Sequence, residues 1–149
     1  MFADFKELEK IINYKFKNNK ILIQCLTHKS YDSLNNNEKL EFLGDRVLGL
    51  IISEKLFELY PDYNEGKLDK KFASLVNRKK CLEISKIINL EKFIITANKG
   101  KKVVIENKII SDACEALIGG IYLDTGIEST RKFILKFWNE YLKQDDLNL

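Results

Sequence analysis

Residues 38–48 read Glu38-Lys39-Leu40-Glu41-Phe42-Leu43-Gly44-Asp45-Arg46-Val47-Leu48, and two patterns overlap in them. Placed on a helix with about 100° between residues, Glu38, Glu41 and Asp45 fall in a stripe about 60° wide. The apolar residues gather on the opposite side, centred about 170° from Glu38; they are Leu40, Leu43, Val47, Leu50 and Ile51. Because neighbouring like charges destabilise a helix, the acidic stripe suggests a bound cation, although a solvated acidic face has the same pattern.

Residues 109–123 predict a second helix of the same kind. Its apolar positions fall within about 60° of one another; they are Ile110, Cys114, Leu117 and Ile121. Asp112 and Glu115 lie on the far side, and Gly119 shares their stripe. Since glycine has no side chain, we expect Gly119 to leave space beside the carboxylates for a metal, water or substrate. For Gly120 close packing between helices is an equal alternative.

The two predicted helices could bring four carboxylates together. Carboxylate oxygens with no histidine or cysteine among them suit a hard cation such as Mg²⁺ or Mn²⁺. The sequence therefore favours a divalent-metal site built from acids alone.

Length and composition restrict the class of protein. The chain has 149 residues, of which 45% are hydrophobic and 32% charged, as expected for one globular domain. The cysteines, Cys25, Cys81 and Cys114, are widely spaced and the only histidine is His28, which argues against a zinc site and for reduced thiols in the cytoplasm. The charged N-terminus and the lack of an apolar run of ~20 residues argue against a signal peptide and a membrane role.

Basic residues form two clusters that could track phosphates or simply keep the protein soluble. The first comprises Lys67, Lys70, Lys71, Arg78, Lys79 and Lys80, and the second comprises Lys99, Lys101 and Lys102. For His28, in a Thr-His-Lys-Ser turn, we favour a structural hydrogen-bonding role over acid–base chemistry.

Helical periodicity extends over most of the chain and predicts an all-α fold. The expected helices are residues 3–12, 18–26, 38–60, 65–76, 77–88, 107–124 and 127–143. Asn37 is expected to cap the third helix, and Pro61 to end it. Residues 92–106 have a β-type composition, but we predict a short helix and a loop there.

Four motifs in this order resemble blocks of the ribonuclease III family, and the resemblance covers about residues 5–142. They are Leu26-Thr27-His28-Lys29-Ser30-Tyr31, the acidic stretch Glu38–Leu48, Asn64-Glu65-Gly66-Lys67-Leu68, and Asp112-Ala113-Cys114-Glu115-Ala116-Leu117-Ile118-Gly119-Gly120. Arg46 is a departure, because the family usually has a small residue there. It could line the rim of the site or a subunit contact, paired with an acid or a phosphate.

The resemblance implies a helical endonuclease domain that forms a two-fold dimer and uses Mg²⁺, or Mn²⁺ in its place, to hydrolyse phosphodiester bonds of double-stranded RNA. The family's products carry short 3′ overhangs. A non-catalytic RNA-binding or ribosome-associated scaffold of the same fold is the alternative, and loss of a metal acid would indicate it. We expect no small-molecule cofactor.

The family's functional residues carry over directly onto this sequence. Glu41, Asp45, Asp112 and Glu115 match the metal-binding acids, with Asp45 and Glu115 as catalytic residues, while Glu38 and Glu65 match auxiliary acids. Phe42 lies about 130° from the centre of its helix's apolar face, and the matching family residue inserts into a pocket of the second subunit. Larger family members continue into a double-stranded-RNA-binding domain, which we expect to be absent from residues 1–149.

Overall fold

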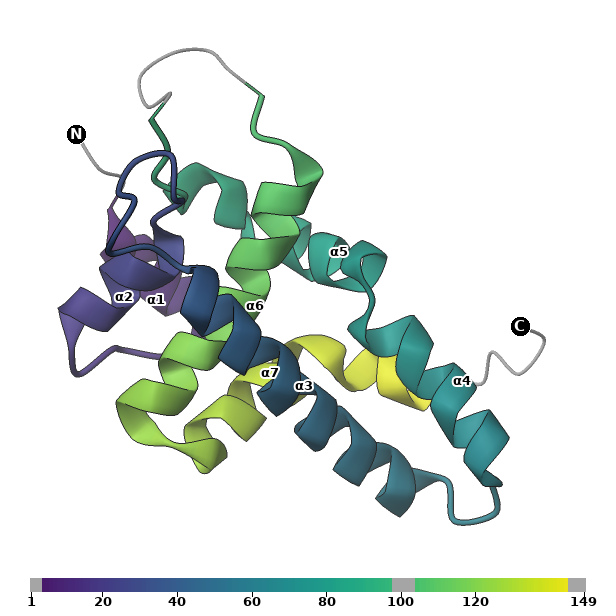
Figure 1. Ribbon diagram of the computed structural model, residues 1–149. Coiled ribbons are helices and arrows are strands. Elements are labelled where there is room, and N and C mark those ends of the chain that lie inside the picture. Colours follow the sequence, from purple (N-terminus) through teal and green to yellow (C-terminus); the bar gives the residue numbers. More distant parts are fainter. Residues whose placement is uncertain (1–3, 98–103, 145–149) are drawn as a thin grey trace.

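The computed structural model describes residues 4–97 and 104–144, which fold into seven α-helices and one short 3₁₀ helix (Figure 1). The helices are α1 (Phe5–Ile12), α2 (Asn19–Leu26), α3 (Glu38–Leu59), α4 (Glu65–Val76), α5 (Arg78–Ile88), η1 (Leu90–Phe93), α6 (Asn107–Thr125) and α7 (Ile127–Lys143). The predicted all-α fold is confirmed, and α3 ends two residues before Pro61.

Helix α6 forms the centre of the molecule, and α2, α3, α5 and α7 pack around it (Figure 1). Its residues are buried almost continuously from Ala116 to Ile121. A helix that is buried on nearly all sides is a core element rather than an amphipathic surface helix. The position of α6 therefore fixes where its two acids, near its N-terminal end, can lie.

The contact between α3 and α6 depends on two glycines that face each other. A Cβ atom on Gly44 would lie less than 3.0 Å from the backbone oxygen of Glu115, and one on Gly119 less than 3.0 Å from that of Leu40. The prediction that Gly119 leaves room for a ligand is therefore wrong, because the space is filled by the backbone of α3. Gly120 packs in the same way against Cys25 of α2, which confirms the packing alternative.

Because of this close contact, the buried face of α3 is rotated about the helix axis relative to the face that apolar periodicity predicts. Leu40, Val47 and Ile51 are buried as predicted, but Leu50 is 62% exposed. Leu48 and Ile52, on the Gly44 side of the helix, are buried in its place. The prediction for Leu50 is wrong because α6 approaches α3 at Gly44, a residue that contributes no hydrophobicity to the helical pattern.

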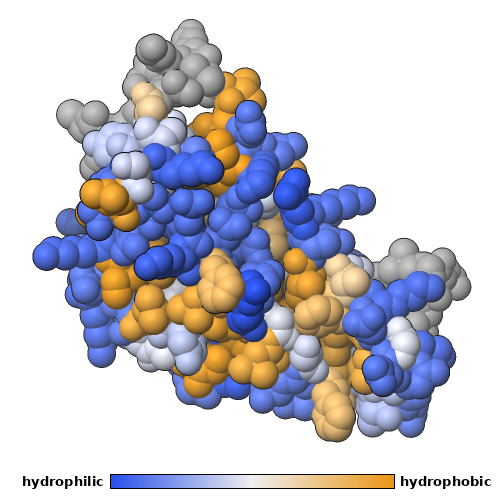
Figure 2. All heavy atoms as spheres, in the orientation of Figure 1, coloured by the Kyte–Doolittle hydropathy of each residue, from blue (hydrophilic) through white to orange (hydrophobic). Residues whose placement is uncertain are grey.

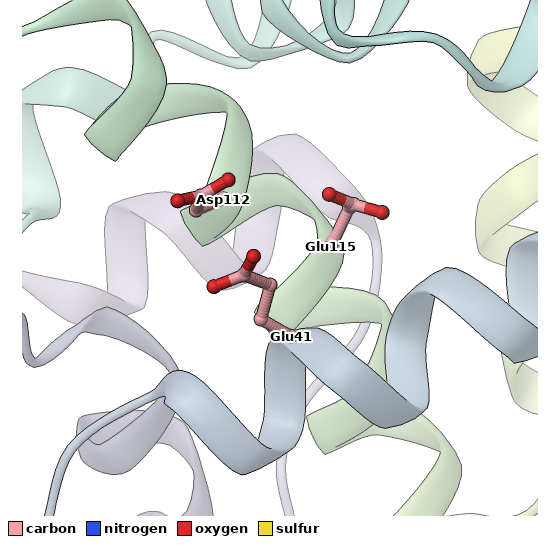
Figure 3. A group of neighbouring side chains, drawn as sticks. All are labelled: Glu41, Asp112 and Glu115. Carbon is pink, nitrogen blue, oxygen red and sulfur yellow. The ribbon is translucent and has the colours of Figure 1, made fainter.

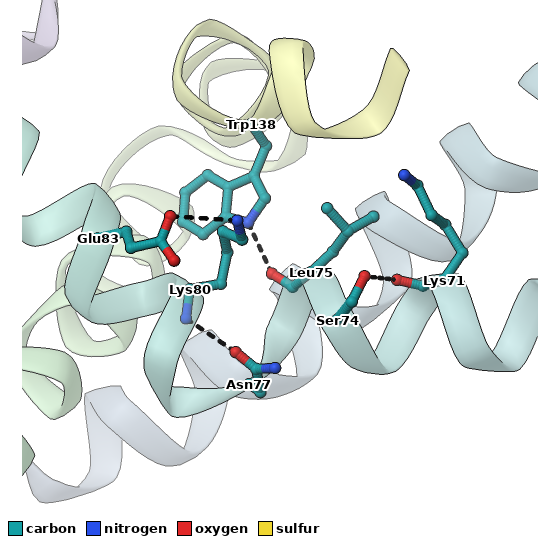
Figure 4. Close-up of polar contacts among 7 residues, drawn as sticks. All are labelled: Lys71, Ser74, Leu75, Asn77, Lys80, Glu83 and Trp138. Carbon is teal, nitrogen blue, oxygen red and sulfur yellow. Dashed lines mark hydrogen bonds and ion pairs between the residues drawn. The ribbon is translucent and has the colours of Figure 1, made fainter. Parts of the chain in front are cut away.

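The junction of α4 and α5 is held against α7 by polar contacts (Figure 4). Asn77 ends α4 and caps α5, and its Oδ1 accepts a hydrogen bond of 2.8 Å from the Lys80 backbone N–H. The indole Nε1–H of Trp138 donates to the Leu75 carbonyl at 2.8 Å. The junction thus orients α5, whose first residue is Arg78.

Residues 90–97 contain the short helix Leu90–Phe93, two residues earlier than predicted. Ile95 then pairs with the end of α2: its N–H donates to the Leu26 carbonyl at 2.8 Å, and its carbonyl accepts from His28 N–H at 2.9 Å. The β-type composition reflects this isolated parallel bridge. The second basic cluster, residues 99–102, lies outside the described residues.

All three cysteines are buried and free, as predicted for reduced thiols used as small apolar residues. Across residues 4–97 and 104–144, no helix is long and apolar enough to span a bilayer.

Candidate metal centre

Three carboxylates converge where the start of α3 packs against the N-terminal half of α6. Glu41 extends from α3 towards Asp112 and Glu115 of α6 (Figure 3), and one oxygen of each lies within 4.8 Å of the others. All three residues are half-buried. This spacing is compatible with one small cation between the three side chains.

The loop before α3 fixes the position of these acids. Asn37 occupies the N-cap position, as predicted, but its side chain donates to the Cys25 carbonyl at 3.2 Å instead of capping the helix. The side-chain oxygen of Asn36 accepts from the Glu38 backbone N–H at 3.1 Å. Both asparagines are buried, so the start of α3 is anchored to α2.

The other acids singled out in the sequence lie at different distances from this cluster. Asp45, half-exposed one turn further along α3, is hydrogen-bonded to Glu115. Glu38 is exposed and lines a pocket beside Glu41 and Asp112. Glu65 lies at the opposite end of α3, at the start of α4 (Figure 1), so the structure does not bring it to the cluster within one chain.

The clustered acids resist ionisation. Burial, together with a hydrogen bond that protonated Glu115 donates to the Asp45 carboxylate, raises the pKa of Glu115 to about 9. Burial and the neighbouring charge of Asp112 also raise the pKa of Glu41. Both shifts arise because negative charge is confined in partly desolvated surroundings. A divalent cation would relieve the repulsion between these carboxylates, so the donor set fits a hard cation.

Two basic side chains contact the acids. Lys108 Nζ lies 2.5 Å from Asp112 Oδ2, one helical turn apart on α6. Arg46 Nη1 lies 3.3 Å from Asp45 Oδ2, and its guanidinium carbon lies 4.0 Å from the centre of the Phe42 ring. Of the alternatives for Arg46, the structure shows pairing with an acid. Lys108 was missed in the sequence, although its spacing of four residues from Asp112 is typical of a helix ion pair.

His28 lies on the rim of the site and makes local hydrogen bonds. It lines a pocket of about 350 Å³ together with Lys29, Glu38, Glu41 and Asp112. Its Nδ1 accepts the Ser30 backbone N–H at 3.1 Å and lies 2.8 Å from the Ser30 hydroxyl. Burial and the nearby charge of Lys29 lower the pKa of His28, which favours the neutral ring. These bonds support the predicted structural role.

Comparison with known proteins identifies the family. The family model described as "Ribonuclease-III-like" matches residues 18–142. Ribonuclease 3 of Pelagibacter ubique is 64% identical over 137 residues, which cover 91% of this chain and 62% of that protein. The chain belongs to the ribonuclease III family.

Other members of the ribonuclease III family support the assignment and the fold. Ribonuclease 3 of Aliarcobacter butzleri is 43% identical over 149 residues, with 99% of this chain and 66% of that protein covered. The chain thus spans somewhat less than two thirds of the length of these two relatives. A solved structure of the nuclease domain of ribonuclease III from Campylobacter jejuni is 40% identical, with a TM-score of 0.85 over 93% of this chain and 98% of that one. Dicer from Pichia stipitis, 23% identical with a TM-score of 0.69 over 91% of this chain and 60% of that one, shares the fold.

The raised pKa of Glu115 predicts that metal binding releases a proton. In the folded, metal-free protein Glu115 keeps its proton up to a pKa of about 9, above its ordinary value of 4.5. A cation must displace that proton, so affinity for Mn²⁺ should rise with pH between 6 and 9, by up to about tenfold per pH unit. Calorimetry in buffers of different ionisation enthalpy measures the released proton. Heats that do not depend on the buffer would contradict this prediction.

Proposed function

We propose that this chain acts as a divalent-metal-dependent endoribonuclease that hydrolyses phosphodiester bonds in double-stranded RNA and leaves short 3′ overhangs. The convergence of Glu41, Asp112 and Glu115 within 4.8 Å carries the proposal, because it occurs in a member of the ribonuclease III family. Mg²⁺ is the proposed cation, with Mn²⁺ as a substitute, since both prefer oxygen ligands.

In the proposed mechanism, Glu41, Asp45, Asp112 and Glu115 hold the cation at the junction of α3 and α6. When bound, such a cation lowers the pKa of a water molecule and offsets the charge that develops on the phosphate. Asp45 and Glu115 share a hydrogen bond, so this pair can hold or release a proton next to the scissile phosphate. We therefore propose these two as the catalytic residues, with Glu38 as an auxiliary acid on the rim.

Basic residues near α5 are proposed to contact the RNA phosphates, but fewer of them than the sequence suggested. Lys71 is 4% exposed, and its Nζ donates to the Gln144 carbonyl at 2.6 Å. Lys80 Nζ lies 3.2 Å from Glu83 Oε2 (Figure 4). It also lies 3.6 Å from the centre of the Tyr141 ring. The exposed members of this cluster are Lys67, Lys70, Arg78 and Lys79. Duplex RNA is read mainly through phosphates and 2′-hydroxyls, which suits such side chains.

We propose that two chains form a dimer through the exposed face of α3. Phe42, Leu50 and Phe57 are 61%, 62% and 76% exposed and lie along one side of the helix. In Figure 2, apolar side chains gather over α3 on the face in view. Exposed apolar stripes of this kind mark protein contacts. The Campylobacter jejuni structure is described as flexible in its region involved in dimer formation.

A two-fold dimer would also give Glu65 a role. In one chain Glu65 lies at the far end of α3 from the metal acids. A two-fold contact repeats each surface on both partners. Glu65 of the second chain can therefore lie near RNA that is bound at the metal acids of the first chain. We propose that it acts as an auxiliary acid across the dimer.

Replacing the exposed ring on α3 should weaken this dimer. Phe42→Ala removes a side chain whose burial against a partner contributes about 2 kcal/mol or more, so the dimer dissociation constant should rise by about thirtyfold or more. Ile87→Ala, an exposed apolar residue on α5 (58%), is the matched control. Sedimentation equilibrium measures both variants. A wild-type monomer at micromolar concentration would contradict the proposed dimer, and an unchanged dissociation constant in Phe42→Ala would exclude this face.

Incubation of an internally labelled RNA duplex with the protein tests the proposed activity. In Mg²⁺ the duplex should be cut on both strands, and EDTA should prevent cutting. The alternative, an RNA-binding scaffold, predicts binding without cleavage in either condition. The presence of all four acids that we propose as metal ligands favours the enzyme.

A further inference from the structure

The positively charged side chain of Lys108 contacts the acid cluster. It lies in the first turn of α6, and its ammonium group is 2.5 Å from Asp112 Oδ2. The two side chains differ in exposure: that of Asp112 is 18% exposed and that of Lys108 is 58% exposed. The carboxylate is therefore held by the fold, whereas the lysine reaches it from the solvent side.

The same lysine faces the other groups of the site. It lines the 350 Å³ pocket with Glu38, Glu41 and Asp112. A positive charge in this pocket offsets part of the repulsion between the acids, as a divalent ion would. The lysine and a metal ion therefore compete for one patch of negative potential, and for Asp112 directly.

We propose that Lys108 is a tethered counter-ion that holds Asp112 in the metal-free protein, is displaced when a divalent cation binds, and thereby sets the metal affinity of the site. The inference rests on the proposed function, because it assigns the acid cluster to a metal. Displacement is feasible because the lysine is mostly exposed and an exposed ion pair is weak. The pair therefore lowers the metal affinity without preventing binding.

A simple role in helix stability would give the same ion pair, since oppositely charged residues four apart stabilise a helix. The two explanations differ in their effect on metal binding. A helix-stabilising pair predicts that removal of the lysine lowers stability and leaves the metal affinity unchanged. The counter-ion predicts that removal of the lysine makes the metal bind more tightly.

The test measures Mn²⁺ binding to the wild-type protein and to four variants, Lys108→Gln, Lys108→Arg, Lys29→Gln and Glu41→Gln. Binding is detected as the loss of the free-ion signal in electron paramagnetic resonance. Lys108→Gln should bind Mn²⁺ about two- to fivefold more tightly, the factor expected from removal of one partly exposed ion pair. Lys108→Arg keeps the charge and should resemble the wild type. Lys29→Gln removes a charge from the rim of the same pocket without breaking the contact with Asp112, so its effect should be clearly smaller.

Thermal unfolding supplies a second measurement. In EDTA, Lys108→Gln should melt at a lower temperature than Lys29→Gln, and saturating Mn²⁺ should raise its melting temperature by a larger amount. Equal Mn²⁺ affinities for Lys108→Gln and Lys29→Gln would overturn the inference while leaving the metal site intact. If the wild type shows no saturable binding that Glu41→Gln weakens, the proposed metal site fails and the inference fails with it.

Discussion

Gly44→Ala is expected to destabilise the protein by about 3 kcal/mol or more, because the new methyl group would overlap the backbone of α6. Its Cβ atom would lie less than 3.0 Å from the Glu115 carbonyl oxygen and from the Gly119 nitrogen. Neither of these is a side chain that can rotate away. The two helices must separate, and the separation moves Glu115 away from Glu41.

The same helix offers a matched control. A Cβ atom on Gly49 would meet only the Phe72 ring, at 3.5 Å, which is an ordinary contact. Gly49→Ala should therefore be neutral or stabilising by up to about 1 kcal/mol, since alanine is the better helix former. Thermal unfolding should show Gly44→Ala melting roughly 6–12 °C below the wild type. Equal melting temperatures for the two variants would refute the close contact between α3 and α6.

Glu115→Gln should abolish RNA cleavage and leave the fold intact. Glutamine keeps the shape of the side chain but removes a negative charge from the metal site, and loss of a central catalytic group costs about 10³-fold or more. Because its raised pKa of about 9 keeps Glu115 protonated at pH 7 in the metal-free protein, the neutral glutamine resembles the state already present. The melting temperature in EDTA should therefore not fall.

Duplex affinity separates binding from chemistry in this variant. With Ca²⁺ in place of Mg²⁺, duplex binding should survive better than cleavage does, since phosphate contacts are spread over many basic side chains. Glu140→Gln, an exposed acid on α7 away from the site, is the control and should cut like the wild type. If Glu115→Gln cuts at a near wild-type rate in limiting Mg²⁺, Glu115 is not a metal ligand.

Much of the fold was predictable because the helix boundaries are encoded locally. Asparagines that cap helices and Pro61 set several of the ends, so most predicted helices agree with the structure within two residues. The contact between α3 and α6 was not predictable in detail. Helical periodicity is computed from apolar side chains, whereas this contact is made by Gly44 and Gly119, which have none.

The acids of the site were predictable, but their arrangement was only partly so. Periodicity places Glu41, Asp112 and Glu115 on the far side of each helix from its apolar stripe, and the structure brings these three together. Glu65 matches the family motif but lies far from the cluster within one chain, because it begins α4 at the opposite end of α3. Lys108 escaped notice because an ion pair four residues apart is common on helices, and only the fold shows that it faces the acids.

The most direct test of the metal centre is anomalous diffraction from crystals soaked in Mn²⁺. The account predicts a manganese peak between α3 and α6, at about 2.0–2.3 Å from carboxylate oxygens of Glu41, Asp112 and Glu115. It also predicts that Lys108 Nζ has moved away from Asp112. The account would be contradicted if the protein cuts RNA in solution but its well-ordered crystals show no manganese peak at these three acids, or show a peak only elsewhere.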